Sequence, residues 1–308
     1  MRHVPVLLAE VIDFLQLKSG MNVVDCTLGD AGHSEAMLTK TSPDGRLLGL
    51  DADPESLLRA KQYLYGFGAR ASFVRENFFH LQEIVNREHF SPVNVILMDL
   101  GWSSPQFSER GRGFSFEKDE PLDMRYGGPA QSLGGVGDTA AEILNTDSQK
   151  ELELIFKNYG EEKLAKEISA AVVLRRGDAP FKTTSELVEI ILAVYREKLH
   201  SAKEIPWVGG IHPATKVFQA LRIAVNKELD VLKETLPQAV DALSPGGRLA
   251  VIAFHSLEDR IIKHFFQAQE NKTLKIITKK PRVASKEEIK ANPRARSAKL
   301  RIIEKLEN

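Results

Sequence analysis

Three aspartates each end a short apolar run in the first hundred residues, and their carboxylates are candidates for ligand binding. Asp25 ends VVD, Asp51 ends RLLGLD and Asp99 ends VNVILMD. A carboxylate in such a place is costly to bury unless it meets hydrogen-bond donors or a positive charge. The three acids therefore predict a ligand that offers hydroxyl or amine donors, a cation, or both.

A loop that contains Gly29 and Gly32, in the stretch DCTLGDAGHS, follows the first of these acids. Nicotinamide and flavin enzymes use G-x-G-x-x-G to bring a pyrophosphate onto a helix N-terminus, and the spacing here does not match it. Asp30 would also repel a pyrophosphate. S-adenosylmethionine has no phosphate and carries a positive sulfonium that suits nearby acids, and Asp51 can accept both of its ribose hydroxyls. An ordinary strand-to-helix turn with a capping aspartate is the alternative interpretation.

Further polar sets lie in the second half of the chain. The stretch FHSLEDR contains His255, Glu258 and Asp259, residue types that also occur in metal sites and catalytic triads. Glu258 and Asp259 are adjacent and point apart, and no serine nucleophile elbow occurs, so we expect a loop network that positions substrate and no metal ion. Another set shares one face of a predicted helix, as substrate contacts or as a solvated surface: Gln219, Arg222 and Asn226.

The order of elements explains how the three aspartates would meet. The apolar runs NVVDCT, RLLGLDAD, ASFVREN and VNVILMDLG are typical of buried strands, and helical stretches such as SEAMLTK and DPESLLRAKQYL separate them. This alternation predicts a parallel sheet covered on both faces. Ligands of such sheets bind beyond the carboxyl ends of the strands, where the aspartates lie.

The strand pattern stops after residue 107, and a loop rich in Gly, Pro and charge leads into helices. TTSELVEIILAVY begins with a capping box from Thr183 to Glu186 and places Leu187 and Ile191 at helical spacing. A long amphipathic helix in HPATKVFQALRIAVNKELDVLKETL and an SPGG turn lead to the strand RLAVIAF, and TLKIITK and SAKLRIIEKL can supply two last strands. We therefore predict three segments: the first part of an α/β domain over 1–108, an all-helical insertion over 109–212, and the second part of the α/β domain over 213–308.

Composition limits the partners that the whole chain can attract. Its 42 Lys and Arg residues balance 42 Asp and Glu residues, and a single cysteine, Cys26, suits a reducing compartment. No apolar run approaches the roughly 18 residues of a membrane span, so we expect a cytoplasmic protein without membrane contact. Residues 275–308 contain 11 Lys or Arg against four Glu, a net charge of +7. This basic segment suits RNA phosphates, and a solvated surface is its alternative.

Ten motifs occur in order and carry a resemblance to a known family: HVPVLL, DCTLGDAGHS, LDADP, DLGWSSPQF, RGFSF, PLDMR, YGEE, HPATKVFQALRIAVNKEL, PGGRLAVIAFHSLEDR and NPRARSAKLR. Over essentially its whole length the chain resembles the bacterial 16S rRNA (cytosine-N(4))-methyltransferases, the RsmH or MraW family. The resemblance implies a Rossmann-like, S-adenosylmethionine-dependent methyltransferase sheet with an inserted helical domain. It also implies methylation of the exocyclic N4 amine of a cytosine in the decoding region of 16S rRNA, with the small ribosomal subunit as partner.

The resemblance assigns roles to individual residues. It implies cofactor contacts from Ala31, Gly32, His33, Asp51, Phe78, Asp99 and Gln106. Catalysis needs an acceptor beside the amine and a stacking face for the base, and for these we expect Asp99, Ser103, Ser104 and Phe107. For substrate contacts we expect Arg222, Asn226, His255, Arg294 and Arg296.

Two departures from the family pattern concern the glycine loop. The family commonly has two adjacent glycines where this chain has Ala31-Gly32, and often a basic or small residue at Asp30. Alanine adopts a positive φ only at a cost, which leaves the loop geometry open. Other functions also stay open, namely an amine methyltransferase acting on DNA or protein, or an RNA-binding or assembly factor that retains the fold. The sequence does not decide between free rRNA and assembled subunit, or between monomer and homodimer.

Overall fold

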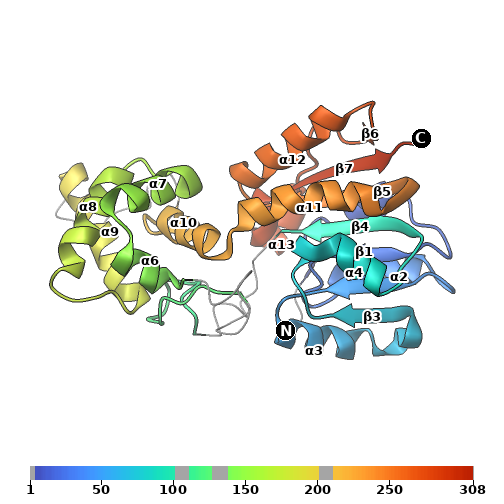
Figure 1. The fold of residues 1–308 in the computed structure, drawn as a ribbon, viewed down its shortest axis with the longest axis horizontal. Helices are drawn as coiled ribbons and strands as arrows, with labels where there is room; N and C mark the ends of the chain where they lie inside the picture. The colour runs from blue at the N-terminus through green and yellow to red at the C-terminus, as the bar shows by residue number, and fades with distance from the viewer. Residues whose placement is uncertain (1–3, 101–110, 127–137, 201–210, 308) are drawn as a thin grey trace. The chain divides into compact units, whose positions relative to one another are not determined.

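The computed structural model describes residues 4–100, 111–126, 138–200 and 211–307, and the chain divides into two compact units. The first combines Met1–Trp102 with Leu229–Asn308, and the second spans Ser103–Glu228. We call them the α/β unit and the helical unit. Figure 1 shows a sheet with helices in the first and a group of helices in the second.

A seven-stranded sheet forms the centre of the α/β unit. Its strands are β1 (Val23–Asp25), β2 (Leu47–Leu50), β3 (Ala71–Val74), β4 (Val93–Asp99), β5 (Leu243–Ala253), β6 (Leu274–Ile276) and β7 (Lys299–Lys305). Their order is β3-β2-β1-β4-β5-β7-β6, with β1 to β5 parallel and β7 antiparallel to both of its neighbours. The predicted α/β fold is confirmed. The strand order reverses between β1 and β4, which is where doubly wound sheets bind their ligands.

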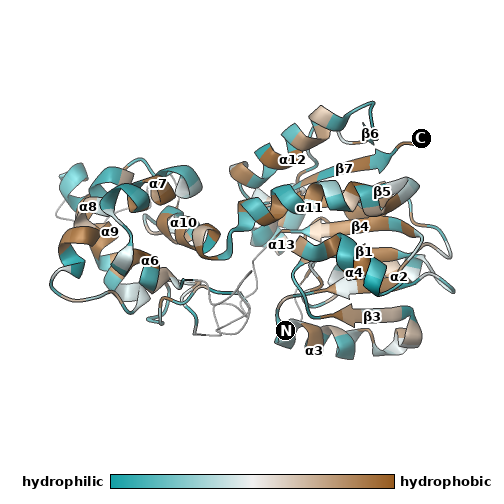
Figure 2. Cartoon of the chain, viewed as in Figure 1, coloured by the Kyte–Doolittle hydropathy of each residue, from teal (hydrophilic) through white to brown (hydrophobic). Residues whose placement is uncertain are grey.

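Helices cover this sheet. They are α1 (Leu8–Leu15), α2 (Gly32–Lys40), α3 (Pro54–Tyr63), α4 (Leu81–Arg87), α11 (Glu228–Ala242), α12 (Ser256–Gln269) and α13 (Lys286–Ala291), with 3₁₀ turns η1 (Tyr65–Arg70), η2 (Phe78–His80) and η3 (Pro293–Ser297). In Figure 2, β4 is mostly hydrophobic, whereas α11 and α12 show both colours along their length. Apolar strands between amphipathic helices are what burial of both sheet faces requires. No helix in the described ranges is long and apolar enough to cross a membrane.

The helical unit contains α6 (Ala140–Thr146), α7 (Gln149–Gly160), α8 (Ala165–Arg176), α9 (Thr184–Leu199) and α10 (Thr215–Asn226). The predicted capping box at Thr183 and Glu186 begins α9, and Leu187 and Ile191 are buried in the core of the unit. Gly160 at the end of α7 lies so close to α10 that an added Cβ would approach the Lys216 carbonyl oxygen to 2.5 Å. These contacts make α10 a part of the helical core.

Two predicted elements differ in the structure. The long helix predicted from residue 212 is two helices, because Lys227 adopts a left-handed φ of 50° between α10 and α11. The helical unit therefore extends to Glu228 and not to residue 212, since α10 packs inside it. The SPGG turn lies within β5, where the pairing with β4 is irregular between Leu243 and Arg248. A bulge of this kind accommodates the turn residues inside the strand.

Candidate functional site

The three predicted aspartates lie at one edge of the sheet. Asp25 is the last residue of β1, Asp99 is the last residue of β4, and Asp51 directly follows β2. The strand registers pair Asp25 with Gly49 of β2 and with Leu97 of β4, so the three strand ends meet at a common rim. This is the placement that the strand pattern predicts.

Asp25 is the buried member of the set and is engaged with its own loop. Its Oδ2 accepts the Ser34 hydroxyl at 2.6 Å, and its Oδ1 accepts the N–H of Thr27 at 3.1 Å. Burial raises the pKa of Asp25, and the Ser34 hydrogen bond opposes that rise. The Thr27 hydroxyl also accepts the N–H of Asp99 at 2.7 Å. Asp25 and Thr27 therefore tie the ends of β1 and β4 together, with Ser34 of α2 held against them.

Asp51 has the geometry of an acceptor for paired hydroxyls. Its two carboxylate oxygens accept the N–H groups of Gly29 and Asp53, each at 2.9 Å, and the residue is only partly buried. Each oxygen has further acceptor capacity, because a carboxylate offers about four lone-pair sites. Desolvation raises the pKa of Asp51 to about 7, against the two backbone hydrogen bonds. Protonation of Asp51 and binding of a hydroxyl donor therefore compete near neutral pH.

The glycine loop has a left-handed backbone at Ala31, where the family commonly has glycine. Gly29 and Ala31 have φ of 51° and 57°, and Ala31 is the fully buried N-cap of α2. Ala31 thus takes up the left-handed backbone that favours glycine, at a cost of order 1 kcal/mol. Its neighbour Gly32 packs against Pro5, where an added Cβ would lie 2.9 Å from the proline Cγ. The N-terminal segment thus fixes the start of α2.

Asp30 does not stand unpaired beside the site. The Arg59 Nε of α3 donates to its Oδ1 at 2.8 Å, and the Asp30 side chain is 3% exposed. Nothing in the sequence pattern marks Arg59 as the partner of Asp30. It lies 29 residues from Asp30 on another helix, and its stretch DPESLLRAKQYL shows only an amphipathic pattern.

His33 connects the rim to the N-terminal segment. Its Nε2 lies 3.0 Å from the Val6 carbonyl oxygen, and its Nδ1 lies 3.7 Å from Asp99 Oδ2. A carbonyl only accepts, so the proton of this hydrogen bond is on Nε2. Leu7 in turn donates its N–H to Glu288 Oε1 at 2.7 Å. The motif HVPVLL marks this segment in the sequence, but its residue types do not reveal the contact with α2.

Phe78 begins η2, just beyond the end of β3, and is 8% exposed. The N–H of Asp51 donates to the carbonyl of Val74 at 3.3 Å, so Phe78 follows a strand end at the same rim. Its stacking on a cofactor ring stays a prediction. The remaining predicted residues of the loop after β4 lie outside the described residues: Ser103, Ser104, Gln106 and Phe107.

FHSLEDR begins α12, and its polar side chains are engaged in a helix cap and an ion pair. His255 is the N-cap of α12, and its Nδ1 accepts the N–H of Glu258 at 3.4 Å. Glu258 Oε2 accepts the N–H of Phe254 at 2.7 Å, which completes a reciprocal cap. Asp259 instead meets Arg301 at 2.6 Å, and this contact lowers its pKa in spite of desolvation. His255 lies just beyond Ile252, the β5 partner of Asp99. Its contact with substrate stays a prediction.

Arg222 and Asn226 are both engaged inside the helical unit. Arg222 donates from Nε and Nη2 to the two carboxylate oxygens of Glu228, at 2.9 and 3.0 Å. Asn226 accepts the N–H of Tyr126 at 3.0 Å and donates to the Met124 carbonyl at 2.8 Å. These contacts hold the PLDMR segment on the end of α10. They give both residues a structural role, and the predicted contact with substrate is not tested by them.

Arg294 and Arg296 lie in η3, directly before β7, whose first residue pairs with Ala253 at the end of β5. Because β7 is antiparallel to β5, its start lies at the rim that carries the aspartates. Arg294 is half-buried and Arg296 is exposed, and desolvation lowers the pKa of Arg294. Within the described ranges neither arginine makes an ion pair. An anionic ligand at this place would compensate the desolvated guanidinium.

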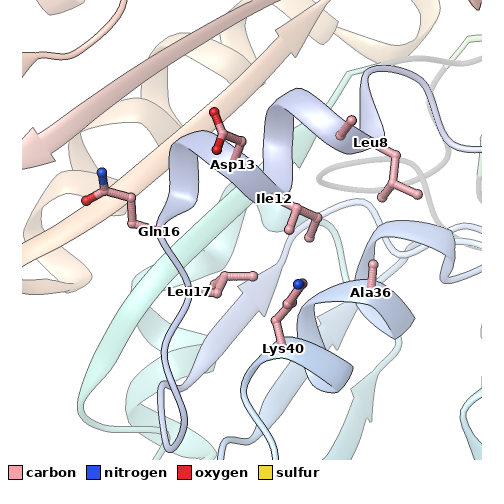
Figure 3. Close-up of a pocket in the computed structure, with 8 residues that line it drawn as sticks. Leu8, Ile12, Asp13, Gln16, Leu17, Ala36 and Lys40 are labelled. Carbon is pink, nitrogen blue, oxygen red and sulfur yellow. The ribbon is translucent and has the colours of Figure 1, made fainter.

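A separate open pocket of about 600 Å³ lies between α1 and α2. Figure 3 shows Leu8, Ile12 and Leu17 facing Ala36 and Lys40 across it. None of the residues predicted for the site lines this pocket. It is therefore distinct from the rim that carries the aspartates.

Known proteins are similar to this chain in structure or in sequence. The crystal structure of a putative rRNA-methylase from Clostridium thermocellum is similar to this chain with a TM-score of 0.47 and 12% identity, and the match covers 99% of this chain and 100% of that one. Ribosomal RNA small subunit methyltransferase H of Heliobacterium modesticaldum is 46% identical over 321 residues, 99% of this chain and 98% of that protein. The protein of the same name from Carboxydothermus hydrogenoformans is 46% identical over 320 residues, with the same coverage. The family model described as MraW methylase family matches residues 1–306. The chain belongs to the MraW methylase family.

Proposed function

We propose that this protein transfers a methyl group from S-adenosylmethionine to the exocyclic N4 amine of a cytosine in 16S rRNA of the small ribosomal subunit. The observation that carries the proposal is the rim of the sheet, where Asp51 and Asp99 stand beside a loop with left-handed backbone at Gly29 and Ala31. The names of the near full-length relatives support rRNA as the substrate. The position on the base follows from the family resemblance.

The rim fits the chemistry of S-adenosylmethionine. The cofactor offers two ribose hydroxyls as donors, which Asp51 can accept, and a positive sulfonium, which suits the Asp99 carboxylate. The other residues that would hold it are Ala31, Gly32, His33, Phe78 and Gln106. When bound, the cofactor supplies an electrophilic methyl group.

The chain must make a poor nucleophile reactive. The lone pair of a cytosine amine is conjugated with the ring, so an acceptor on its N–H helps to localise that pair. The Asp99 side chain is 16% exposed at the rim and can accept this proton. Ser103, Ser104 and Phe107 follow Asp99 in the chain, and we assign them the second acceptor and the stacking face. The base must leave its stack to reach such a site.

The substrate contact that the described residues support best is the η3 pair. Arg294 and Arg296 belong to the segment with net charge +7, and both lie at the aspartate rim. An RNA phosphate there would meet a half-desolvated guanidinium and an exposed one. We also assign substrate contacts to His255, the N-cap of α12, and to Arg222 and Asn226 of α10.

A methylation assay with product identification tests the proposal. The full chain is incubated with S-adenosylmethionine and either unmethylated small subunits, their free rRNA, or DNA, and the digested nucleosides are analysed by mass spectrometry. We expect N4-methylcytidine from small subunits or their rRNA. A methylated base in DNA or a methylated ribosomal protein would show that DNA or protein, and not rRNA, is the substrate. Binding to the subunit without any methylated product would identify an assembly factor.

A further inference from the structure

A series of hydrogen bonds links the glycine loop to the loop that contains Asp51 and Asp53, and both loops flank the candidate cofactor site. The N–H of Gly29 donates to Asp51 Oδ2, and the N–H of Asp53 donates to Asp51 Oδ1, each at 2.9 Å. The Asp53 carboxylate then accepts the hydroxyl of Ser56 at 2.6 Å. These bonds run from the glycine loop, across Asp51, to the first turn of α3.

Arg59 closes this set into a ring. Its Nη2 donates to the Ser56 hydroxyl at 3.2 Å, and its Nε donates to Asp30 at 2.8 Å. Asp30 follows Gly29 in the chain, so the bonds return to their starting point. We call the six residues the hydrogen-bond ring: Gly29, Asp30, Asp51, Asp53, Ser56 and Arg59.

The ion pair between Arg59 and Asp30 is largely buried, so its loss is costly. The side chain of Asp30 is 3% exposed and that of Arg59 is 25% exposed. Removal of the guanidinium would leave a buried carboxylate without its cation, and a loop in that position relaxes toward solvent. The same loop holds Ala31 at a φ of 57°, a backbone conformation that persists only where its surroundings enforce it.

We propose that Arg59 is a positioning residue for the cofactor, because it closes the hydrogen-bond ring and so fixes the glycine loop relative to the Asp51 carboxylate. The inference rests on the proposed use of S-adenosylmethionine. Arg59 itself contacts neither the ribose nor the methyl group in this account. Its effect is preorganisation, since a loop ordered before binding loses less entropy when the ligand arrives.

Calorimetry of S-adenosylhomocysteine binding to the full chain tests this role. Arg59→Met keeps the aliphatic stem and loses the donors, and we expect its affinity to fall about tenfold. Arg87→Met is the matched control. Arg87 pairs with Glu76 at 2.8 Å and Glu88 at 3.3 Å on the same unit, but lies outside the hydrogen-bond ring. We expect this control to bind as the wild type does.

A double variant separates positioning from general stability. Asp30→Asn combined with Arg59→Met removes the buried carboxylate charge together with the guanidinium that compensates it, but leaves the hydrogen-bond ring open. We therefore expect only part of the lost affinity to return, to about threefold below the wild type. Arg59→Lys keeps the charge but cannot bridge Asp30 and Ser56 together, so we expect a loss of about threefold. It replaces Arg59→Met if that variant does not fold. In the methylation assay, the KM for the cofactor should rise while kcat at saturation stays within about twofold.

Several results would overturn the inference. Wild-type affinity in Arg59→Met, or in Arg59→Lys where only that variant folds, would show that the ring does not position the loop. Equal losses in Arg59→Met and Arg87→Met would reduce Arg59 to a contributor to stability. Failure of the wild-type chain to bind S-adenosylhomocysteine would instead contradict the proposed cofactor, and the two failures are therefore distinct.

Discussion

The rim of the α/β unit and the polar face of α10 in the helical unit both carried candidate residues, and they satisfy their polar groups differently. At the rim, Asp51 takes its hydrogen bonds from backbone N–H groups and stays in part accessible to solvent. On α10, Arg222 meets both oxygens of the Glu228 carboxylate, whose side chain is 7% exposed. The Asp51 carboxylate therefore keeps acceptor capacity for a ligand, whereas the pair of Arg222 and Glu228 stabilises the helical unit.

The difference has a topological cause. The carboxyl ends of parallel strands converge because the chain passes through the sheet in one direction, so polar residues there face a shared crevice. Residues on one helix face share only a side of that helix. Whether they meet a ligand or another segment depends on what packs there, and at Asn226 that segment is PLDMR.

The largest effect that sharpens this comparison is expected at Asp51. Asp51→Ala removes the acceptor for two hydroxyls, each hydrogen bond contributing roughly 1.5–3 kcal/mol, so affinity for S-adenosylhomocysteine should fall at least about a hundredfold. Calorimetry measures this. Asp230→Ala is the matched control, because Asp230 is an exposed acid of the same unit that pairs only with Lys233 in the described ranges. Unchanged binding in Asp51→Ala would remove the rim from the cofactor site.

Arg222→Met should act on stability and not on the cofactor. The change leaves the Glu228 carboxylate without its bidentate partner, and we expect the free energy of unfolding to fall by about 2 kcal/mol. Urea unfolding measures the loss, and affinity for S-adenosylhomocysteine should stay within about twofold. Adding Glu228→Gln should recover part of the stability. Full stability together with a raised KM for RNA would contradict the structural role of Arg222 and leave it the proposed substrate contact alone.

Asp99→Asn should act on chemistry at the rim. The amide keeps the size of the side chain but loses the charge and the ability to take a proton. We expect turnover to fall at least about tenfold, on the order of 1.4 kcal/mol of barrier. The initial rate of methylation at saturating cofactor measures this, with circular dichroism to establish that the variant is folded. Near wild-type turnover in a folded variant would exclude Asp99 from the mechanism.

The sequence predicted the rim because its signals are local. An acid ends an apolar run at Asp25, Asp51 and Asp99. Once these runs are taken as parallel strands, the three acids must lie at the same edge of the sheet. The motif HVPVLL was visible too, but its contact with Gly32 and His33 depends on how the N-terminal segment folds back.

Contacts between residues far apart in the sequence were not predictable in the same way. The pair of Asp30 and Arg59 joins the glycine loop to α3, and no periodicity connects the two residues. It makes Asp30, an acid that would repel a pyrophosphate, part of the hydrogen-bond ring. The end of the helical unit was also set too early, because α10 and α11 share an amphipathic pattern and only the left-handed φ at Lys227 separates them. Residues 213–226 therefore pack with the insertion.

The smallest effect is expected in the basic segment. Replacing Arg294 and Arg296 with alanine should weaken RNA binding severalfold and reduce the salt slope of log K by up to about two, with cofactor affinity unchanged. Binding titrations at several salt concentrations measure this. Lys286→Ala with Lys290→Ala is the matched control, since both lysines are exposed on α13 in the same segment. Equal slopes in both double variants would make the η3 arginines ordinary surface charges.

The pH dependence of S-adenosylhomocysteine affinity tests the central claim, that an ionised Asp51 at the rim accepts the ribose. The pKa of Asp51 in the free protein is raised to about 7, so the carboxyl is largely protonated below that pH. Binding then requires loss of the proton, and we predict that affinity falls by up to about tenfold for each pH unit below 7 and levels off above it. The same titration with Asp51→Asn should give weaker binding with a flat profile across this range, because no carboxyl remains to titrate. A wild-type profile as flat as that of Asp51→Asn would contradict the account.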